Sequence, residues 1–324
     1  MHSLPELSII FVNWNSSHYL RACLASIYSA TSGLDFDVIV VDNGSPSDDA
    51  DQLKREFPGI NLLKSRENLG FARANNLGFK SSAGRYVLFL NPDTRVIGLA
   101  IPTMLARLKS LPDAGIIGCR LLNSDLSIQT ACIQRFPTVL NQVLDIELLR
   151  VRWPACKLWR IEPLFSDREE PSEVEVVSGA CLMIRRDVFE TVGLFSEDYF
   201  MYAEDVDLCF KIHKTGLKIY YVGDASVIHY GHGSTKQRDN NQWVAITQRK
   251  AIMQFCRKTR GPLYAWMYRV VMGVAAICRL TVMVPLLPLE RIATEKQRLY
   301  SASRKWAAVL KWAIGLDDQA VRSS

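Results

Sequence analysis

The first ninety residues alternate short apolar runs with stretches of helical character. The apolar runs, each too short for a buried helix by itself, cover residues 7–12, 38–41, 60–63 and 86–90. Between them we expect helices at residues 19–28 and 52–57 and a third that opens within 68–78. Short apolar strands that alternate with helices predict an α/β fold, with a mostly parallel central sheet flanked by helices.

Two of these expected strands lead into an aspartate. Asp42 follows the run at 38–41, and Asp93 follows the run at 86–90 within an Asn-Pro-Asp sequence. In an open α/β sheet, ligands bind in the crevice beyond the carboxyl ends of the strands. A buried carboxylate is costly unless it is paired, hydrogen-bonded or bound to a metal. The two acids therefore indicate one polar ligand held from two sides; the alternative is that both are turn or cap residues.

A third feature is the glycine- and asparagine-rich segment at residues 67–78. Glycine lets a backbone approach a ligand closely, and asparagine offers a donor and an acceptor, which makes Asn68, Gly70 and Asn76 candidates for binding. Arg73 could face a phosphate. The alternative is a glycine-broken helix start with a solvated arginine. The segment carries neither a Walker loop nor a G-x-G-x-x-G pattern, so dinucleotide binding has no support.

The second half of the chain contains a cluster of acids. Residues 176–186 read as one strand with a glycine bend at Gly179, and Glu204, Asp205 and Asp207 follow within a predicted helix. Like charges at short range raise at least one pKa, which favours a carboxylate tuned as a base. Helical spacing turns the acids in different directions, so we expect separate tasks. The alternative is an acid-rich helix start that the helix dipole stabilises.

Histidine is the next candidate for metal or phosphate binding. His229 and His232 follow a strand-like run at residues 218–222. Either imidazole could bind a metal ion or contact a phosphate. The alternative is a polar turn.

Five short motifs follow one another along the chain: VVDNGS at 40–45, NLGF at 68–71, LNPDT at 90–94, SGA at 178–180 and EDVD at 204–207. In this order they resemble the inverting GT-A glycosyltransferases of family 2, and the Asn-Pro-Asp form resembles the rhamnosyltransferase-like branch. The resemblance covers roughly residues 7–260. It implies a nucleotide-binding half followed by an acceptor half.

The resemblance also implies roles for single residues. Asp42 would accept from the N3–H of the donor base, with Asn13 lining the same pocket, and Asp93 would hold Mg²⁺ or Mn²⁺ on the diphosphate. Asn91 departs from the family's first acid, which should weaken the metal affinity. Asp205 would be the base, and Glu204 or Asp207 would orient the acceptor or a loop. The expected nucleotide-sugar site is completed by Asn68, Gly70, Arg73, Asn76, Asn91 and Gly179, and the expected metal site by His229.

Composition adds the cellular setting. The 324 residues are 48% hydrophobic with a net charge of +6, and eight cysteines are scattered without a CxxC pair. No signal peptide is visible, so we expect a cytoplasmic protein with reduced thiols. We expect a dTDP- or UDP-sugar donor, a lipid-linked or polysaccharide acceptor, and no nucleic acid partner.

The last third of the chain indicates a membrane surface. Residues 270–289 hold one charge, Arg279, and residues 304–314 combine basic residues with tryptophans. This pattern fits an in-plane anchor on anionic lipid. The alternatives are packing on the catalytic domain or on a dimer partner, and a spanning helix. We therefore expect a catalytic domain at 1–260 and a helical, basic tail at 261–324, peripheral at the inner face of the cell membrane.

Two other functions compete with the transferase hypothesis. A sugar nucleotidyltransferase also uses an α/β nucleotide-binding domain and carboxylate-held Mg²⁺, but the acids at Glu204 and Asp205 argue against it. A non-catalytic glycan-binding protein on the same fold would have no need of Asp42, Asp93 and Asp205 together. The preferred hypothesis is an inverting, metal-dependent sugar transferase with Asp205 as its base.

Overall fold

A computed structural model gives the fold in two compact units, each described here by itself. The first unit comprises Met1–Phe136 and Ile161–Gln237, and the second Pro137–Arg160 and Arg238–Ser324. These bounds differ from the expected boundary at residue 260, because residues 137–160 and 238–260 group with the C-terminal helices. The structure describes residues 4–31, 33–46, 49–145, 152–153, 156, 158–161, 170–231, 241–290 and 298–316.

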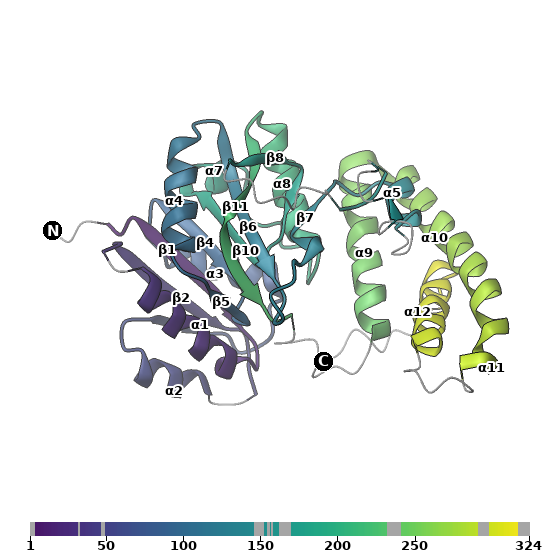
Figure 1. Ribbon diagram of the computed structural model, residues 1–324, viewed down its shortest axis with the longest axis horizontal. Helices are drawn as coiled ribbons and strands as arrows, with labels where there is room; N and C mark the ends of the chain where they lie inside the picture. The colour runs from purple at the N-terminus through teal and green to yellow at the C-terminus, as the bar shows by residue number, and fades with distance from the viewer. Residues whose placement is uncertain are drawn as a thin grey trace. The chain divides into compact units, whose positions relative to one another are not determined.

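Four parallel strands open the first unit (Figure 1). They run in the order β3-β2-β1-β4, with β1 at Leu7–Asn13, β2 at Phe36–Asp42, β3 at Asn61–Lys64 and β4 at Tyr86–Leu90. The helices between them are α1 at Ser17–Ala30, α2 at Asp49–Glu56 and α3 at Phe71–Lys80. The α/β alternation that the apolar pattern predicts is confirmed.

Antiparallel strands extend this sheet. Strand β10 pairs antiparallel with β4 and β6, β11 runs parallel to β6, and β5 and β8 pair antiparallel with β11. Their bounds are β5 Thr94–Val96, β6 Ala114–Leu122, β8 Ser172–Val174, β10 Cys181–Arg185 and β11 Lys218–His229. The fold is therefore α/β with a mixed central sheet.

The single strand expected at residues 176–186 is two strands in two sheets. Strand β9, Val176–Val177, pairs with β7, Ile133–Gln134, while β10 begins at Cys181 in the main sheet. A turn separates β9 from β10, in which the Cys181 N–H donates to the Ser178 carbonyl. The expectation of one bent strand was wrong, because two adjoining apolar runs do not reveal which sheet each joins.

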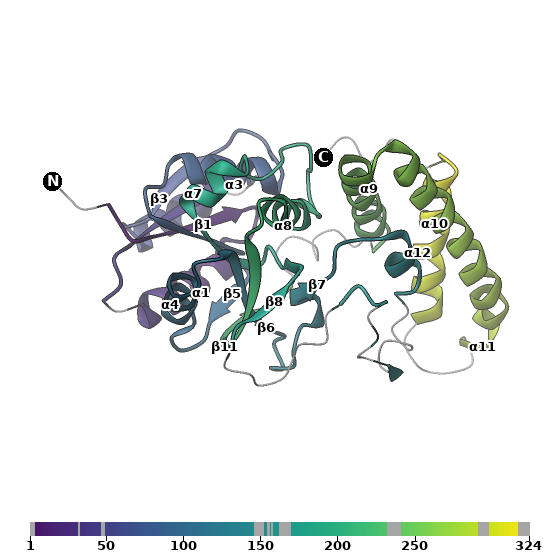
Figure 2. The ribbon, with the colours of Figure 1, turned by 90° about the horizontal axis from the view of Figure 1, so that it is seen from above.

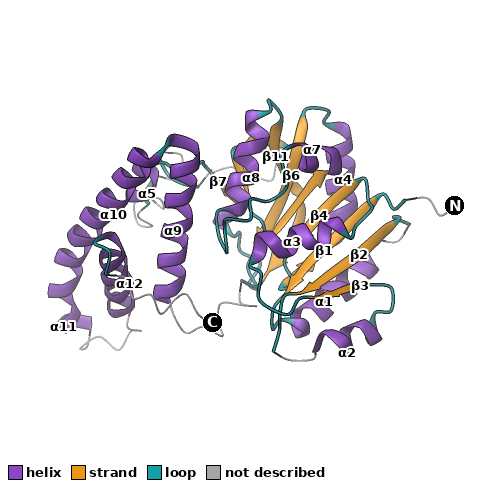
Figure 3. Ribbon diagram, turned by 180° about the vertical axis from the view of Figure 1, so that it is seen from behind, coloured by secondary structure: helices purple, strands orange, loops and turns teal. Residues whose placement is uncertain are grey.

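Helices cover both faces of the main sheet. In Figures 2 and 3, α3, α7 (Arg186–Thr191) and α8 (Glu204–Lys214) lie on one face, and α1 and α4 (Ala100–Ser110) lie on the other. Packing is close: a Cβ on Gly78 of α3 would lie 2.6 Å from the Ile10 side chain of β1. A larger residue there would push α3 off the sheet.

The second unit is helical. Helices α9, α10 and α12 pack on one another, with the short α5 against α10 (Figure 1). Their bounds are α5 Val139–Val143, α9 Asn241–Arg260, α10 Pro262–Met283, α11 Leu287–Glu290 and α12 Arg298–Ala313, with a 3₁₀ turn at Val284–Leu286. Its core contains Ala245, Tyr268, Met272, Ala276, Trp306, Val309 and Trp312. Within the described residues, one stretch, Pro262–Leu286, is long and apolar enough to cross a membrane.

Candidate active site

One cavity of about 290 Å³ lies in the first unit, where the predicted acids converge. Its walls come from the ends of β1, β4 and β11, the turn before β10 and the first turn of α8. The expected site residues that line it are Asn68, Asn91, Asp93, Gly179, Glu204, Asp205 and His229. Residues more than 130 positions apart in the sequence therefore meet at one site.

Asp93 and His229 form the polar centre of one wall. The Asp93 carboxylate is buried, and its Oδ1 lies 3.4 Å from His229 Nε2. The antiparallel register of β5 and β11 sets this pairing, because His229 lies opposite Thr94, the residue after Asp93. The Asn91 amide nitrogen lies 3.3 Å from the same Nε2.

Gln129 fixes the orientation of the His229 ring. Its Nε2 donates to the His229 carbonyl at 2.5 Å, so its Oε1 faces His229 Nδ1 at 3.0 Å. An amide oxygen only accepts, so Nδ1 carries a proton and Nε2 is the atom turned toward Asp93. The sequence analysis did not find Gln129, which lies one hundred residues before its partner.

The Asp93–His229 pair fits a divalent cation that a substrate helps to hold. No group of three or more His, Cys, Asp or Glu side chains among the described residues could hold a metal ion by itself. Mg²⁺ is usually bound by one or two carboxylates plus waters and substrate phosphates. Mn²⁺ also accepts carboxylate and imidazole ligands. A carboxylate and an imidazole nitrogen in one wall match that donor set.

Asn13, Asp42 and Asn43 form a buried polar cluster at the ends of β1 and β2. Asn13 and Asp42 are register partners in the parallel ladder, and Asn13 Nδ2 donates to Asp42 Oδ1 at 3.2 Å. Asn43, which the sequence analysis did not select, lines the cavity. Its Oδ1 accepts from the Leu69 N–H at 2.9 Å, and its Nδ2 donates to Asn68 at 3.0 Å. The Asp-Asn-Gly sequence after β2 was the available signal.

Asp205 is held as a hydrogen-bonded carboxylate at the start of α8. Its Oδ2 accepts from the Gly179 N–H and its Oδ1 from the Val206 N–H, both at 2.8 Å. A Cβ on Gly179 would lie 3.3 Å from the Asp205 Cβ, so glycine permits this approach. Asp205 lines the cavity, and an ionised carboxylate only accepts hydrogen bonds, so it suits the approach of a ligand hydroxyl.

Glu204 has the opposite environment. Its side chain is buried beside the cavity, and its Oε2 has no hydrogen-bond partner among the described residues. Burial, with a smaller contribution from the Asp205 charge, raises the pKa of Glu204 to about 8. The neutral acid is then the favoured form at neutral pH, and its O–H would be a hydrogen-bond donor.

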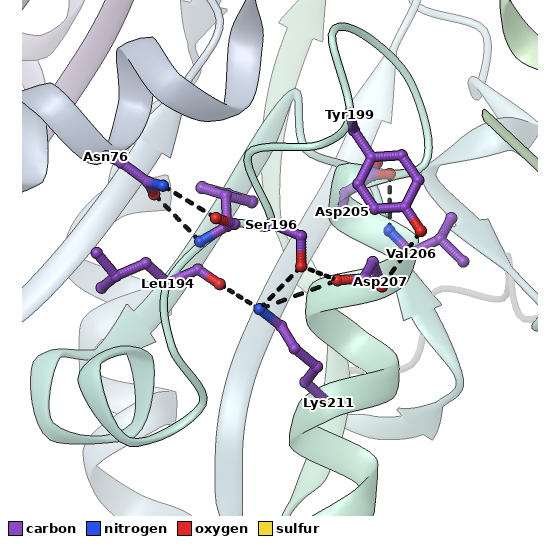
Figure 4. A network of polar contacts seen from close by, with 9 residues as sticks. Asn76, Leu194, Ser196, Tyr199, Asp205, Val206, Asp207 and Lys211 are labelled. Atoms are coloured by element: carbon purple, nitrogen blue, oxygen red, sulfur yellow. Dashed lines mark hydrogen bonds and ion pairs between the residues drawn. The ribbon is translucent and has the colours of Figure 1, made fainter. Parts of the chain in front are cut away.

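Asp207, the third acid of the motif, lies in a buried network behind the cavity (Figure 4). Its carboxylate accepts from Ser196 Oγ at 2.5 Å and from the Tyr199 hydroxyl at 3.2 Å, and Lys211 Nζ lies 3.9 Å away. Burial and the Asp207 charge both raise the pKa of Tyr199. Asp207 therefore ties α8 to the loop at residues 194–203.

The loop at 194–203, which borders the cavity, has an uncommon backbone conformation at its end. Tyr202 and Ala203, directly before α8, have φ values of 71° and 63°. Non-glycine residues in this region cost about 1–3 kcal/mol each and persist only where the surroundings hold them. Met201 and Tyr202 line the cavity together with Trp14 and Phe71. Phe71 ends the NLGF motif, but no motif marked Trp14, Met201 or Tyr202 in the sequence.

Five of the expected binding residues do not line the cavity, namely Asn13, Asp42, Gly70, Arg73 and Asn76. Two of them, Asn13 and Asp42, contact each other. Gly70 has a φ of 80°, and a Cβ there would collide with the Phe200 carbonyl. This glycine therefore lets the start of α3 pack closely against the loop at 194–203. Asn76 donates to the Phe195 carbonyl at 2.9 Å. Arg73 lies 3.9 Å from Glu197 and is largely exposed. These contacts support structural roles for Gly70, Asn76 and Arg73.

Comparison with known proteins gives consistent matches. The sequence model described as Glycosyl transferase family 2 matches residues 8–193, and the one described as Glycosyl transferase family group 2 matches residues 155–316. The N-acetylglucosaminyl-diphospho-decaprenol L-rhamnosyltransferase of Mycobacterium tuberculosis is 32% identical over 242 residues, which are 71% of this chain and 77% of that protein. The rhamnosyltransferase WbbL of Escherichia coli is 25% identical over 231 residues, which are 69% and 83% of the two chains.

Two solved structures share the fold. The mannosyltransferase PcManGT from Pyrobaculum calidifontis, in complex with GDP-Man and Mn²⁺, has a TM-score of 0.58 at 16% identity and covers 97% of this chain and 88% of its own. GalNAc-T7 with UDP, GalNAc and Mn²⁺ has a TM-score of 0.54 at 14% identity, covering 70% and 43%. The expected GT-A architecture is confirmed.

Proposed function

The chain belongs to glycosyl transferase family 2, and on that premise we propose that it transfers rhamnose from a nucleoside diphosphate to a hydroxyl of a lipid-linked cell-envelope glycan. The sugar and the acceptor are supported by the names of the relatives, both of which are rhamnosyltransferases, one acting on a diphospho-decaprenol-linked N-acetylglucosamine. The donor class is supported by the UDP and GDP-Man bound in the two structural neighbours. A dTDP- or UDP-sugar is the proposed donor.

One observation supports the chemistry: Asp205 and the Asp93–His229 pair line the same cavity. In the proposed reaction, Asp205 accepts the proton of the acceptor hydroxyl as that oxygen attacks the anomeric carbon. The bond to the nucleoside diphosphate breaks in the same step, so the anomeric centre inverts. The two backbone N–H groups on Asp205 hold the carboxylate in place for this transfer.

Asp93 and His229 are the proposed ligands of Mg²⁺ or Mn²⁺. When bound, the ion would offset the charge that develops on the leaving diphosphate. Gln129 keeps the Nδ1 proton of His229 in place, so that Nε2 can donate its lone pair toward the ion. Asn91 adds an amide that can contact a diphosphate oxygen or the ion.

Glu204 is proposed to orient the acceptor. Its buried oxygen without a partner and its raised pKa favour a neutral carboxyl group that donates a hydrogen bond to a sugar hydroxyl. Asp42 and Asn13 are proposed to hold the donor base, next to Asn43 and Asn68, which line the cavity. We further propose that the protein works at the inner face of the cell membrane, where a lipid-linked acceptor would be met.

The direct test uses the full chain with dTDP-rhamnose and an N-acetylglucosaminyl-diphospho-polyprenol acceptor. We expect transfer that depends on Mg²⁺ or Mn²⁺ and stops with EDTA, and a product whose anomeric configuration, read by NMR, is opposite to that of the donor. A parallel reaction with dTTP and rhamnose 1-phosphate tests the nucleotidyltransferase alternative. Retention of configuration, or diphosphate release in the parallel reaction, would overturn the proposal.

A further inference from the structure

The outer face of α10 is a long stripe of exposed apolar residues. Its members recur at helical spacing over about five turns, and they are Leu263, Trp266, Met267, Val270, Val274, Ile277, Cys278 and Val282. Trp266 is 63% exposed and Val274 55%. No charged side chain interrupts the stripe. Soluble proteins rarely expose a contiguous apolar surface of this size unless something binds it.

Both charged residues of α10 are turned into the unit. Arg269 donates to the carbonyls of Trp312 and Ala313 at the end of α12, at 2.8 and 3.0 Å. Arg279 donates to the Val143 carbonyl at the end of α5 at 2.7 Å, and its guanidinium lies 4.1 Å from the Trp306 ring centroid. Each arginine therefore satisfies terminal carbonyls of another helix. Arg279, the one charge in the apolar run at residues 270–289, therefore does not lie on the outer face.

The unit that carries this face is strongly basic. Residues 137–160 and 238–324 hold 19 of the chain's 39 lysines and arginines but only 7 of its 33 acids. Exposed Arg257 and Lys258 lie in the last turn of α9, directly before α10 begins at Pro262. A basic surface is attracted to anionic lipid by about 1 kcal/mol per basic residue near the surface.

We propose that the outer face of α10 lies in the plane of an anionic membrane, with its apolar residues among the acyl chains and Trp266 at the headgroup level. This proposal specifies the membrane surface at which the proposed transferase would work, and it rests on that proposed function. Its test measures membrane binding and not turnover, so either proposal can fail while the other holds. Interfacial helices bind through apolar burial together with attraction to anionic lipid, and this unit offers both.

Two alternatives are less compatible with the contacts. A spanning α10 would have lipid on all sides, yet its inner face packs on α9 and α12 and its arginines are bonded to neighbouring helices. A second copy of the chain would bring two strongly basic units together, and like charge opposes that association. An anionic lipid surface can bury the apolar stripe and attract the basic residues of the unit.

Cys278 supplies a probe at a natural position. It lies on the outer face and is exposed, while the other seven cysteines are buried or half-buried. A polarity-sensitive fluorophore on Cys278 of the full chain should shift to the blue with vesicles of phosphatidylglycerol and phosphatidylcholine. Spin labels at shallow lipid depth should quench it more than labels near the bilayer centre. Stronger quenching from the centre would favour a spanning helix and overturn the in-plane proposal.

A matched pair of variants tests the face itself. Val274→Glu adds a charge to the stripe at a residue that is 55% exposed, and Leu99→Glu adds the same charge at an apolar residue of the first unit that is 68% exposed. We expect Val274→Glu to weaken vesicle sedimentation about tenfold or more, because binding scales with the apolar area buried, and Leu99→Glu to leave it unchanged. Salt at 1 M should weaken the unmodified protein only in part, since apolar burial is not screened.

Three results would overturn the proposal. The unmodified protein could fail to sediment with anionic vesicles, or Val274→Glu could sediment as well as Leu99→Glu. Light scattering could instead show a dimer that Val274→Glu converts to a monomer while neither protein binds vesicles, in which case a second copy covers the face. Circular dichroism and unfolding curves check that both variants are folded, so a loss of binding is not a loss of structure.

Discussion

The acids at the strand ends and the acids in the first turn of α8 are held in different ways. Asp42 and Asp93 each face a polar side chain from a neighbouring strand, Asn13 at 3.2 Å and His229 at 3.4 Å. Within α8, Asp205 is bonded to backbone N–H groups, while Glu204 leaves one oxygen without a partner among the described residues. Sheet register therefore builds pairs suited to holding a ligand. The start of α8 instead gives neighbouring acids different hydrogen-bond environments.

The largest expected effect lies at the strand ends. Asp93→Asn removes the only anionic side chain of the proposed Asp93–His229 ligand pair, so we expect turnover and metal-dependent nucleotide binding to be abolished in a folded protein. Mn²⁺ binding with UDP or dTDP, followed by electron paramagnetic resonance, measures this without turnover. Normal turnover by folded Asp93→Asn would refute the metal assignment.

Asp42→Asn is the matched control for that variant. It removes the same charge from another strand end, that of β2, where the expected contact is with the donor base. We expect donor affinity to fall about 10- to 100-fold, the scale of a hydrogen bond to a charged group, with the metal dependence retained. If Asp42→Asn also loses its metal dependence, the two strand ends do not have separate roles.

The second largest expected effect concerns Asp205, the proposed base. We expect Asp205→Asn to keep donor binding but to lower turnover about 10²- to 10⁴-fold, the usual scale of general-base catalysis. Asp187→Asn, at a largely exposed acid, is the control for charge removal. Rapid-mixing kinetics with saturating donor provide the measurement. A collapse of donor affinity with turnover intact would make Asp205 a binding residue.

The strand-end acids could be predicted because one rule places them. Parallel strands have their carboxyl ends at one edge of the sheet, so Asp42 and Asp93 had to approach the same site, whichever residues they paired with. His229 was placed at the metal site of Asp93 through the family resemblance, but the contact itself depends on the register between β5 and β11, which the sequence alone does not reveal. Gln129 was missed for the same reason, because nothing near it in sequence marks its partner.

The segment at 67–78 shows where residue type does not decide between a binding and a packing role. Asparagine and glycine suit a ligand contact and a tight packing contact equally well, and at Gly70 and Asn76 the observed contacts are with the loop at 194–203. The sequence also could not identify Glu204 as the acid whose pKa is raised. Three closely spaced acids predicted that one pKa would rise, but only the burial of the Glu204 side chain in the folded protein identifies which one.

A third effect, on stability, separates Asp207 from Glu204 and Asp205, the other two acids of its motif, which line the cavity. Asp207→Asn leaves Ser196, Tyr199 and Lys211 around a neutral amide that cannot accept from all of them. We expect the free energy of unfolding to fall by about 2–4 kcal/mol, as for other buried charged networks that lose one partner. Urea unfolding at pH 7 measures it. Tyr199→Phe, which removes one hydroxyl, should cost about 1 kcal/mol.

Equal stability of Asp207→Asn and the unmodified protein would contradict this role. The network would then be incidental, and the third acid would need another explanation. A large loss of turnover with no loss of stability would point instead to direct contact with substrate. The expected pattern is the reverse of that for Asp205→Asn, which should change turnover far more than stability.

A last effect, on the pH dependence of stability, sharpens the contrast between Glu204 and Asp205. The pKa of Glu204 is about 8 in the folded protein against an ordinary 4.5, so the folded state binds more protons between these values. Its contribution to stability is therefore complete below pH 4.5 and is lost as pH rises to 8, with a slope of at most about 1.4 kcal/mol per pH unit. Glu204→Gln should remove this slope and make the protein relatively more stable at pH 8.

Urea unfolding at pH 5, 6.5 and 8 measures the slope, with Glu190→Gln, at an exposed acid, as the control. If Glu204→Gln and Glu190→Gln keep the same slope, Glu204 is ionised across this range and cannot be the neutral hydrogen-bond donor proposed for the acceptor.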